Sequence, residues 1–197
     1  GKHSGRHAFK VKLSELGYDF DEDSINTVFD KFKDLADKKK QIFEEDILSL
    51  IENEQNFKKI NYIELIDLSL KCGTNQESEA KLRLNIFGKK KLIKEKGNGP
   101  IDAIFNSLKS LIPNKANLIV YQVNAITKGT DAQAEVNVRL EENNITVHGQ
   151  GSDVDTMVAS AKAYINAMNK LITKRKKAKE SRSLLEVSNK KLNKHVI

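Results

Sequence analysis

Apolar residues in the first third of the chain recur at helical spacing. Between residues 25 and 36 they form one stripe made of Ile25, Val28, Phe29, Phe32, Leu35 and Ala36. The acidic residues 21–23 suit the positive end of this helix, and the lysines at 38–40 suit its other end. Shorter helices are predicted over about residues 4–16 and 44–53. Small helices bury little apolar surface alone, so residues 1–56 are expected to form helical linker subdomains that pack on a larger partner.

The polar stretch 52–59 is followed by a change of period. Apolar and polar residues now alternate, which predicts two strands with one buried face, built on Leu68, Leu70 and Cys72 and on Ala80, Leu82, Leu84 and Ile86. A short third strand is predicted around Leu92. Pro100 then opens a predicted helix whose apolar residues reach Ile112. Residues of about 60–113 therefore form a βββα unit.

The same unit repeats over about residues 114–173. The pattern that begins at Ala80 matches the one that begins at Ala134, and the helix residues Ile101 and Asp102 match Val154 and Asp155. A glycine-containing segment precedes the helix in each copy, at 97–100 and at 149–153. The predicted fold is α+β: the helical linker, then a pseudo-twofold domain over 57–173 with helices packed on sheets. The two corners should be equivalent in space.

Each corner has the chemistry of a small anion site. A glycine turn at a helix N-terminus presents unpaired backbone N–H groups and the positive end of the helix dipole. Asp102 or Asp155, one turn inside the helix, offers a carboxylate to an ammonium group, so the combination suits a zwitterionic amino acid. His148 is a candidate neighbour of such a ligand at the second corner. The alternative, in which both acids only complement the helix dipole, stays open.

The net charge of +7 lies in one segment. Residues 174–197 carry nine Lys or Arg and two Glu, whereas residues 1–173 carry 25 basic and 25 acidic side chains. The basic tail is expected to be disordered or partly helical. A balanced folded region argues against a nucleic-acid partner. A double-stranded-RNA-binding module, which shares the helix-strand-strand-strand-helix order, is kept as a distant alternative.

Other sequence features bound the location and the chemistry. No apolar run approaches the roughly 18 residues of a membrane span, which predicts no membrane partner. The single cysteine, Cys72, and the lack of a signal-like start favour a reducing cytoplasm. His3 and His7 stand four residues apart, yet no cluster of cysteines or carboxylates completes a site, so no metal is predicted. The chain begins at Gly1 inside a basic stretch and is expected to be a piece of a longer protein.

Several longer motifs resemble the 2-isopropylmalate synthase family. Residues 1–9 (GKHSGRHAF), 16–18 (LGY) and 32–40 (FKDLADKKK) are similar to the segment that follows the catalytic barrel of that family. Residues 97–103 (GNGPIDA), 129–134 (GTDAQA) and 160–164 (SAKAY) are similar to its C-terminal regulatory domain. The resemblance covers nearly all of residues 1–173 in the right order.

The resemblance implies a parent acyltransferase of leucine biosynthesis. Its upstream TIM barrel, absent here, would bind a divalent metal and condense acetyl-CoA with 2-oxoisovalerate, so this stretch needs no cofactor and no activity of its own is expected. Leucine would bind as feedback inhibitor at a homodimer interface, making residues 57–173 an allosteric domain. The alternative parent, citramalate synthase, would bind isoleucine. The resemblance also implies that linker residues reach the active site of the partner subunit, where His3 and His7 are the weakest candidates for assisting catalysis.

The effector residues implied by the resemblance fall in three groups. The first corner contributes Asn98, Gly99, Ile101 and Asp102. The second contributes Gly149, Gly151 and Ser152. The apolar side-chain pocket would be shaped by Tyr121, Ala125, Ala132 and Ala134.

Overall fold

The chain divides into two compact units, Gly1–Phe57 and Lys58–Ile197. The structure, a computed structural model, describes residues 2–15, 20–54, 61–111, 115–125 and 132–192. Each unit has its own hydrophobic core. The two are described separately below.

The first unit consists of the three predicted helices, α1 (Lys2–Glu15), α2 (Glu22–Lys38) and α3 (Glu44–Glu54). Their apolar stripes meet in a core that contains Phe9, Val28 and Ile51. One ion pair is buried with it: Lys39 Nζ lies 2.7 Å from Asp46 Oδ1, and the two side chains are 7% and 1% exposed.

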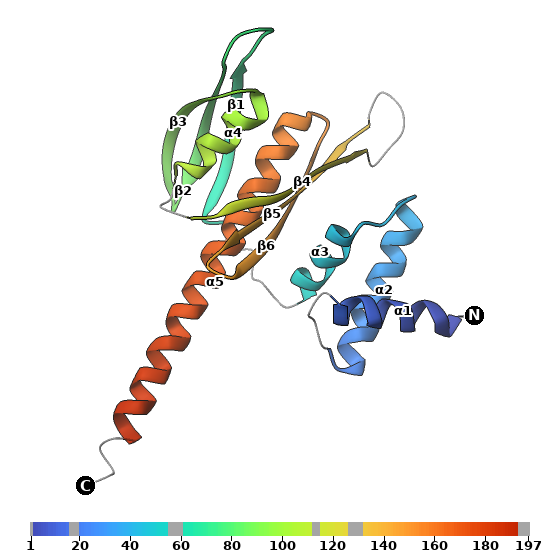
Figure 1. The fold of residues 1–197 in the computed structure, drawn as a ribbon. Coiled ribbons are helices and arrows are strands. Elements are labelled where there is room, and N and C mark those ends of the chain that lie inside the picture. Colours follow the sequence, from blue (N-terminus) through green and yellow to red (C-terminus); the bar gives the residue numbers. More distant parts are fainter. Residues whose placement is uncertain (1, 16–19, 55–60, 112–114, 126–131, 193–197) are drawn as a thin grey trace. The chain divides into compact units, whose positions relative to one another are not determined.

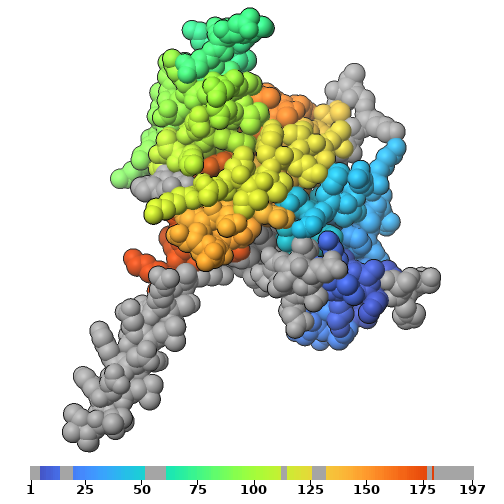
Figure 2. All heavy atoms as spheres, viewed as in Figure 1, coloured from blue at the N-terminus to red at the C-terminus, as the bar shows by residue number. Residues whose placement is uncertain are grey.

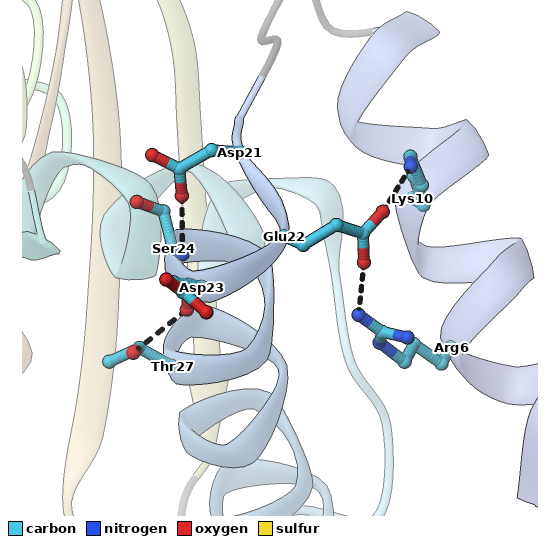
Figure 3. A network of polar contacts seen from close by, with 7 residues as sticks. All are labelled: Arg6, Lys10, Asp21, Glu22, Asp23, Ser24 and Thr27. Atoms are coloured by element: carbon cyan, nitrogen blue, oxygen red, sulfur yellow. Dashed lines mark hydrogen bonds and ion pairs between the residues drawn. The ribbon is translucent and has the colours of Figure 1, made fainter.

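The acidic segment 21–23 begins α2 as its composition predicts. Asp21 is the N-cap, and its Oδ1 accepts a hydrogen bond of 2.7 Å from the backbone N–H of Ser24. Glu22 reaches α1, where its carboxylate lies 2.5 Å from Arg6 Nη2 and 2.8 Å from Lys10 Nζ (Figure 3). These exposed pairs orient two helices rather than supply much stability.

The second unit confirms the predicted α+β fold of two βββα copies (Figure 1). The first copy comprises β1 (Ile63–Lys71), β2 (Ser78–Ile86), β3 (Lys89–Gly97) and α4 (Pro100–Lys109). The second comprises β4 (Asn117–Ala125), β5 (Ala134–Glu142), β6 (Ile145–Asp153) and α5 (Thr156–Leu192). Each copy forms an antiparallel sheet, in the orders β1-β2-β3 and β4-β5-β6.

One hydrophobic core joins both copies. The inward side chains of β2 and β5 are buried with apolar residues of α4 and α5, among them Leu82, Leu84, Val136, Val138 and Leu140. α5 is the element shared by both copies, since it packs on β5 and β6 and also on β1 (Figure 1). Asn169 of α5 makes this link specific: its amide donates to the carbonyl of Ile63 and accepts from the N–H of Ile63, both at 2.9 Å.

The strand register corrects the predicted alignment of the two copies. Ser78 pairs with Gly97 in the first sheet, and Ala134 pairs with Asp153 in the second. The counterpart of Ala134 is therefore Ser78, two positions before the predicted Ala80. Gly97 likewise corresponds to Asp153, and counting two residues onward in each copy matches Gly99 with Asp155. Asp102 then corresponds to Val158 rather than to Asp155.

Two further features concern the turns and the end of the chain. The β2–β3 turn lies at Phe87 and Gly88, both with positive φ. Residues 129–131 of the GTDAQA motif lie outside the described residues. α5 continues as one helix past residue 173 to Leu192. Within the described residues no helix is long and apolar enough to cross a bilayer.

Candidate functional site

The first corner is an open helix N-terminus. Gly99 is the N-cap of α4, with φ −163° and ψ 172°, and no side chain caps the helix there. Pro100 has no N–H, so the backbone N–H groups of Ile101 and Asp102 are the donors that helix geometry leaves without an intrahelical acceptor. A Cβ added to Gly99 would meet no atom within 4 Å, so the space beside the cap residue is open.

This corner opens on a groove of about 710 Å³. The opposite wall is the β1–β2 loop, residues 72–78, so the groove is lined by the first copy alone. Glu77 in that loop is paired with Lys96 of β3 at 3.0 Å, an interaction that raises the pKa of Lys96. Lys96 thus compensates the negative charge of Glu77 at the rim of the groove. The repulsion between Glu77 and an anion bound at the corner is reduced accordingly.

Asp102 is engaged by its own corner. Its Oδ2 accepts a hydrogen bond of 2.9 Å from the backbone N–H of Asn98 and lies 3.5 Å from Asn106 Nδ2. Asn106 also donates to the carbonyl of Lys96 at 3.0 Å, which ties α4 to the end of β3. The carboxylate is exposed, and both contacts go to one oxygen. Oδ1 therefore still faces solvent as an acceptor.

The second corner has the same backbone path and different chemistry. Ala103 N–H donates to Gly99 O at 2.9 Å, and their counterparts in the second copy, Ala159 and Asp155, make the same bond at 2.9 Å. Asp155 therefore stands where Gly99 stands, and its Oδ1 caps the helix by accepting from the N–H of Met157 at 2.8 Å. A fixed carboxylate occupies the position that an anion would take.

Asp153 adds a second internal acceptor at this corner. Its Oδ1 accepts from the N–H of Asp155 at 3.0 Å and its Oδ2 from Lys162 Nζ at 2.8 Å. The hydrogen bond from Lys162 is the main reason that the pKa of Asp153 is lowered. The two corners are thus equivalent in backbone only, and the first alone presents open donors.

The glycines predicted at the second corner lie elsewhere. Gly149 and Gly151 are inside β6, buried beneath α5, and a Cβ on Gly149 would lie 2.1 Å from the carbonyl oxygen of Ala163. They permit close packing of helix on strand, so the prediction of a glycine turn there is wrong. Gly151 and Ser152 border a separate groove of about 340 Å³ whose other wall includes β1 residues.

His148 is a buried residue of β6 and does not lie at a corner. Its Nε2 lies 3.1 Å from Asn137 Oδ1, which also accepts from Gln150 Nε2 at 3.2 Å. Burial, aided by the nearby charges of Lys170 and Arg139, lowers the pKa of His148 from 6.5 to about 3. The ring is therefore neutral at physiological pH and carries its proton on Nε2, facing the amide oxygen.

Residues 41–172 match the model of the LeuA allosteric (dimerisation) domain. The chain belongs to the LeuA allosteric domain family. Residues 1–40 match a second model, the homocitrate synthase post-HMGL domain-like family.

Three curated relatives of this LeuA-domain chain share the name 2-isopropylmalate synthase. The chain is 46% identical over 177 residues to a 2-isopropylmalate synthase of Afipia carboxidovorans and 48% identical over 177 residues to one of Bradyrhizobium sp. ORS 278. It is 47% identical over 174 residues to one of Nitrobacter winogradskyi. Each match covers 88–90% of this chain and 33–34% of the relative. The chain thus spans about a third of the length of the curated relatives it matches.

The other predicted effector residues are dispersed over the LeuA domain. Ile101 packs against the domain core. Tyr121 lies on β4 with its hydroxyl 2.8 Å from Ser160 Oγ. Ala125 pairs with Ala134 at the far end of the β4–β5 pair, and Ala132 precedes β5. Of the residues named from the resemblance, Asn98 and Gly99 line the groove and Asp102 stands behind them.

The remaining signals concern histidines and metals. His3 and His7 lie on α1, and His7 is exposed. Among the described residues no three His, Cys, Asp or Glu side chains gather closely enough to hold a metal ion. Sequence reasoning missed the wall of the groove at residues 72–78. It also missed the caps of the second corner: Asp155 was predicted one turn inside the helix, whereas it lies just before α5 and caps it.

Proposed function

We propose that this chain is the regulatory and dimerising region of a 2-isopropylmalate synthase, the acyltransferase that condenses acetyl-CoA with 2-oxoisovalerate in leucine biosynthesis. The family and the shared name of relatives at 46–48% identity support this parent over a citramalate synthase. The chain matches a third of those relatives, so the metal and acetyl-CoA belong to the remaining part. The described helices and sheets would regulate the activity of the enzyme and would not take part in the condensation reaction.

The ligand of the proposal is leucine, bound at the first corner. The observation that carries it is the uncapped start of α4 at Gly99, which opens on the 710 Å³ groove. The leucine carboxylate would accept from the N–H groups of Ile101 and Asp102, at the positive end of the helix dipole. The ammonium group would bind Asp102 Oδ1. The isobutyl group would extend toward the β1–β2 loop.

Feedback inhibition then requires two states of a homodimer. Leucine shifts their equilibrium only by the difference between its affinities for the two. The first-unit helices would transmit this difference to the catalytic part. Isoleucine and valine offer the same zwitterion with other side chains, so they bind more weakly if the groove selects by shape.

The test exchanges the chemistry of the two corners. Gly99→Asp gives the first corner the cap that Asp155 supplies at the second, and the open space around Gly99 accommodates it. Leucine binding by calorimetry should be lost, while the melting temperature stays the same or rises, because aspartate caps slightly better than glycine. Asp155→Gly is the matched control and should retain binding. Equal leucine affinity in wild type and Gly99→Asp would refute this site, and titrations with isoleucine and valine identify the effector.

A further inference from the structure

The first corner of the LeuA domain contains a chemically reactive pair of residues, Asn98 followed by Gly99. Of the asparagines in the chain, Asn98 alone precedes a glycine. The side-chain amide of an asparagine can be attacked by the backbone nitrogen of the next residue, and a glycine leaves that nitrogen uncrowded because it carries no Cβ. Asn98 is exposed on the wall of the groove. Figure 2 shows the green atoms of the β1–β2 loop and of α4 at the surface turned to the viewer.

Neither of the two reacting groups is held by a hydrogen bond. Among the residues that the structure describes, the side-chain amide of Asn98 and the N–H of Gly99 have no partner. Asp102 engages the corner through a different group, the backbone N–H of Asn98, at 2.9 Å. A Cβ added to Gly99 would meet no atom within 4 Å, so the chain beside the attacking nitrogen has room to move. The attack therefore requires no hydrogen bond of either group to break.

The asparagine of α4 lies in the opposite situation. Asn106 Nδ2 donates to the carbonyl of Lys96 at 3.0 Å and lies 3.5 Å from Asp102 Oδ2. The residue that follows it, Ser107, is buried inside the helix, where its backbone N–H belongs to the helical hydrogen-bond ladder. Both reacting groups are thus fixed at Asn106, which makes it an internal reference for Asn98.

The second corner lacks this chemistry. The strand register places Val154 at the position of Asn98, and Asp155 at that of Gly99. A valine has no amide that a backbone nitrogen could displace. Of the two corners, the one with the uncapped helix is therefore also the one that can be modified.

We infer that Asn98 is a site of spontaneous deamidation that weakens leucine binding at the first corner. The backbone nitrogen of Gly99 gives up its proton and forms a bond to Cγ of Asn98. The bond from Cγ to Nδ2 breaks, and the amide nitrogen leaves with that proton as ammonia. The product is a succinimide ring, and water opens the ring at either carbonyl to leave aspartate or isoaspartate at position 98. Water is the only co-reactant.

Both products change the surroundings of the leucine carboxylate. Each adds a negative charge to the groove wall, near the N–H groups of Ile101 and Asp102 that this carboxylate would occupy, so like charges repel. Isoaspartate also lengthens the main chain by one carbon. The segment has little slack for it, because a Cβ on Gly97 would lie 2.4 Å from Ala103 N, and the N–H of Ala103 is bonded to Gly99 O at 2.9 Å. The added carbon therefore displaces Gly99 from its place before α4.

One tryptic peptide contains both the test and its control. Cleavage after Lys96 and Lys109 releases residues 97–109 (GNGPIDAIFNSLK), which include Asn98 and Asn106. The full chain is aged in mildly alkaline buffer, and fragment-ion mass spectrometry locates the conversion of amide to acid. Conversion at Asn98 should be at least roughly tenfold faster than at Asn106, and Gly99→Ala should slow it by a similar factor, because a Cβ crowds the attacking nitrogen.

Calorimetry on fresh and aged samples measures the consequence for leucine, which rests on the proposed function, whereas the modification does not. Aged wild type should bind leucine about tenfold more weakly than fresh wild type. Asn98→Gln cannot close a succinimide ring, so its leucine affinity, whatever its starting value, should be the same before and after ageing. The melting temperatures of the fresh and aged samples show whether the domain stays folded.

The outcomes separate this inference from the proposed function. An Asn98 amide that persists as long as that of Asn106 overturns the modification site. Conversion at Asn98 with no change in leucine affinity overturns its assigned effect, and so does an equal loss of affinity in aged Asn98→Gln. A fresh wild-type chain that binds no leucine refutes the proposed function, and with it the effect on leucine, while conversion at Asn98 in the same sample still supports the modification site.

Discussion

Acidification should weaken this fold through one residue, His148. The side chain is 1% exposed, and its neutral ring donates from Nε2 to Asn137 Oδ1. Protonation would place a buried cation near Lys170 and Arg139, the two charges that help burial to depress its pKa. The unfolded chain has no such obstacle and takes up the proton near the ordinary pKa of 6.5.

The sign and size follow from linkage. Since the native pKa is about 3, the unfolded state binds the extra proton as the pH falls below 6.5, and stability decreases until the pH reaches about 3. At pH 5 the pH lies 1.5 units below 6.5, and each unit costs about 1.4 kcal/mol, so unfolding becomes easier by roughly 2 kcal/mol. At pH 7 the same effect is about 0.2 kcal/mol.

Urea unfolding followed by circular dichroism at pH 7 and pH 5 measures this difference. His148→Gln keeps a donor toward Asn137 and removes the titrating group. From pH 7 to pH 5, the free energy of unfolding of wild type should therefore fall by roughly 2 kcal/mol more than that of the variant. His7→Gln, at an exposed site, should behave as wild type. Equal losses in wild type and His148→Gln would refute the reasoning.

Three more substitutions probe packing, the ligand and an ion pair. Gly149→Ala should lower the free energy of unfolding by about 3 kcal/mol in urea, because its Cβ meets the backbone of α5, whereas Gly99→Ala meets nothing within 4 Å and should cost well under half of that. Asp102→Ala should weaken leucine binding about tenfold by calorimetry while the domain stays folded; an unchanged titration contradicts its role as ammonium acceptor. Glu142→Gln should cost about 2 kcal/mol at pH 7 and less below pH 4.5, because the hydrogen bond from Arg175 holds the pKa of Glu142 below that value; an equal cost at both pH values contradicts this.

α2 and the two central strands were predictable because each buries one face, and a buried face leaves a period in the sequence. The stripe from Ile25 to Ala36 gave α2, and alternation around Leu82 and Val136 gave the two central strands. The first corner was found for a similar reason, since Gly99 followed by Pro100 is a local signal of a helix start. The groove wall at residues 72–78 left no such signal, because loop residues line a groove only once the sheet brings them beside α4.

The sequence by itself determined that two βββα units occur, and tertiary structure decided how they correspond. Alternation has a period of two, so matching Ala134 with Ala80 or with Ser78 puts the same face inward, and only the hydrogen-bond register tells the two apart. A glycine in the sequence is similarly ambiguous, since it permits either a turn of the chain or the close approach of another backbone segment. Only the packing of α5 on β6 shows that Gly149 serves the second purpose, and only the cap at Asp155 shows that, of the two corners, the one at Gly99 is open.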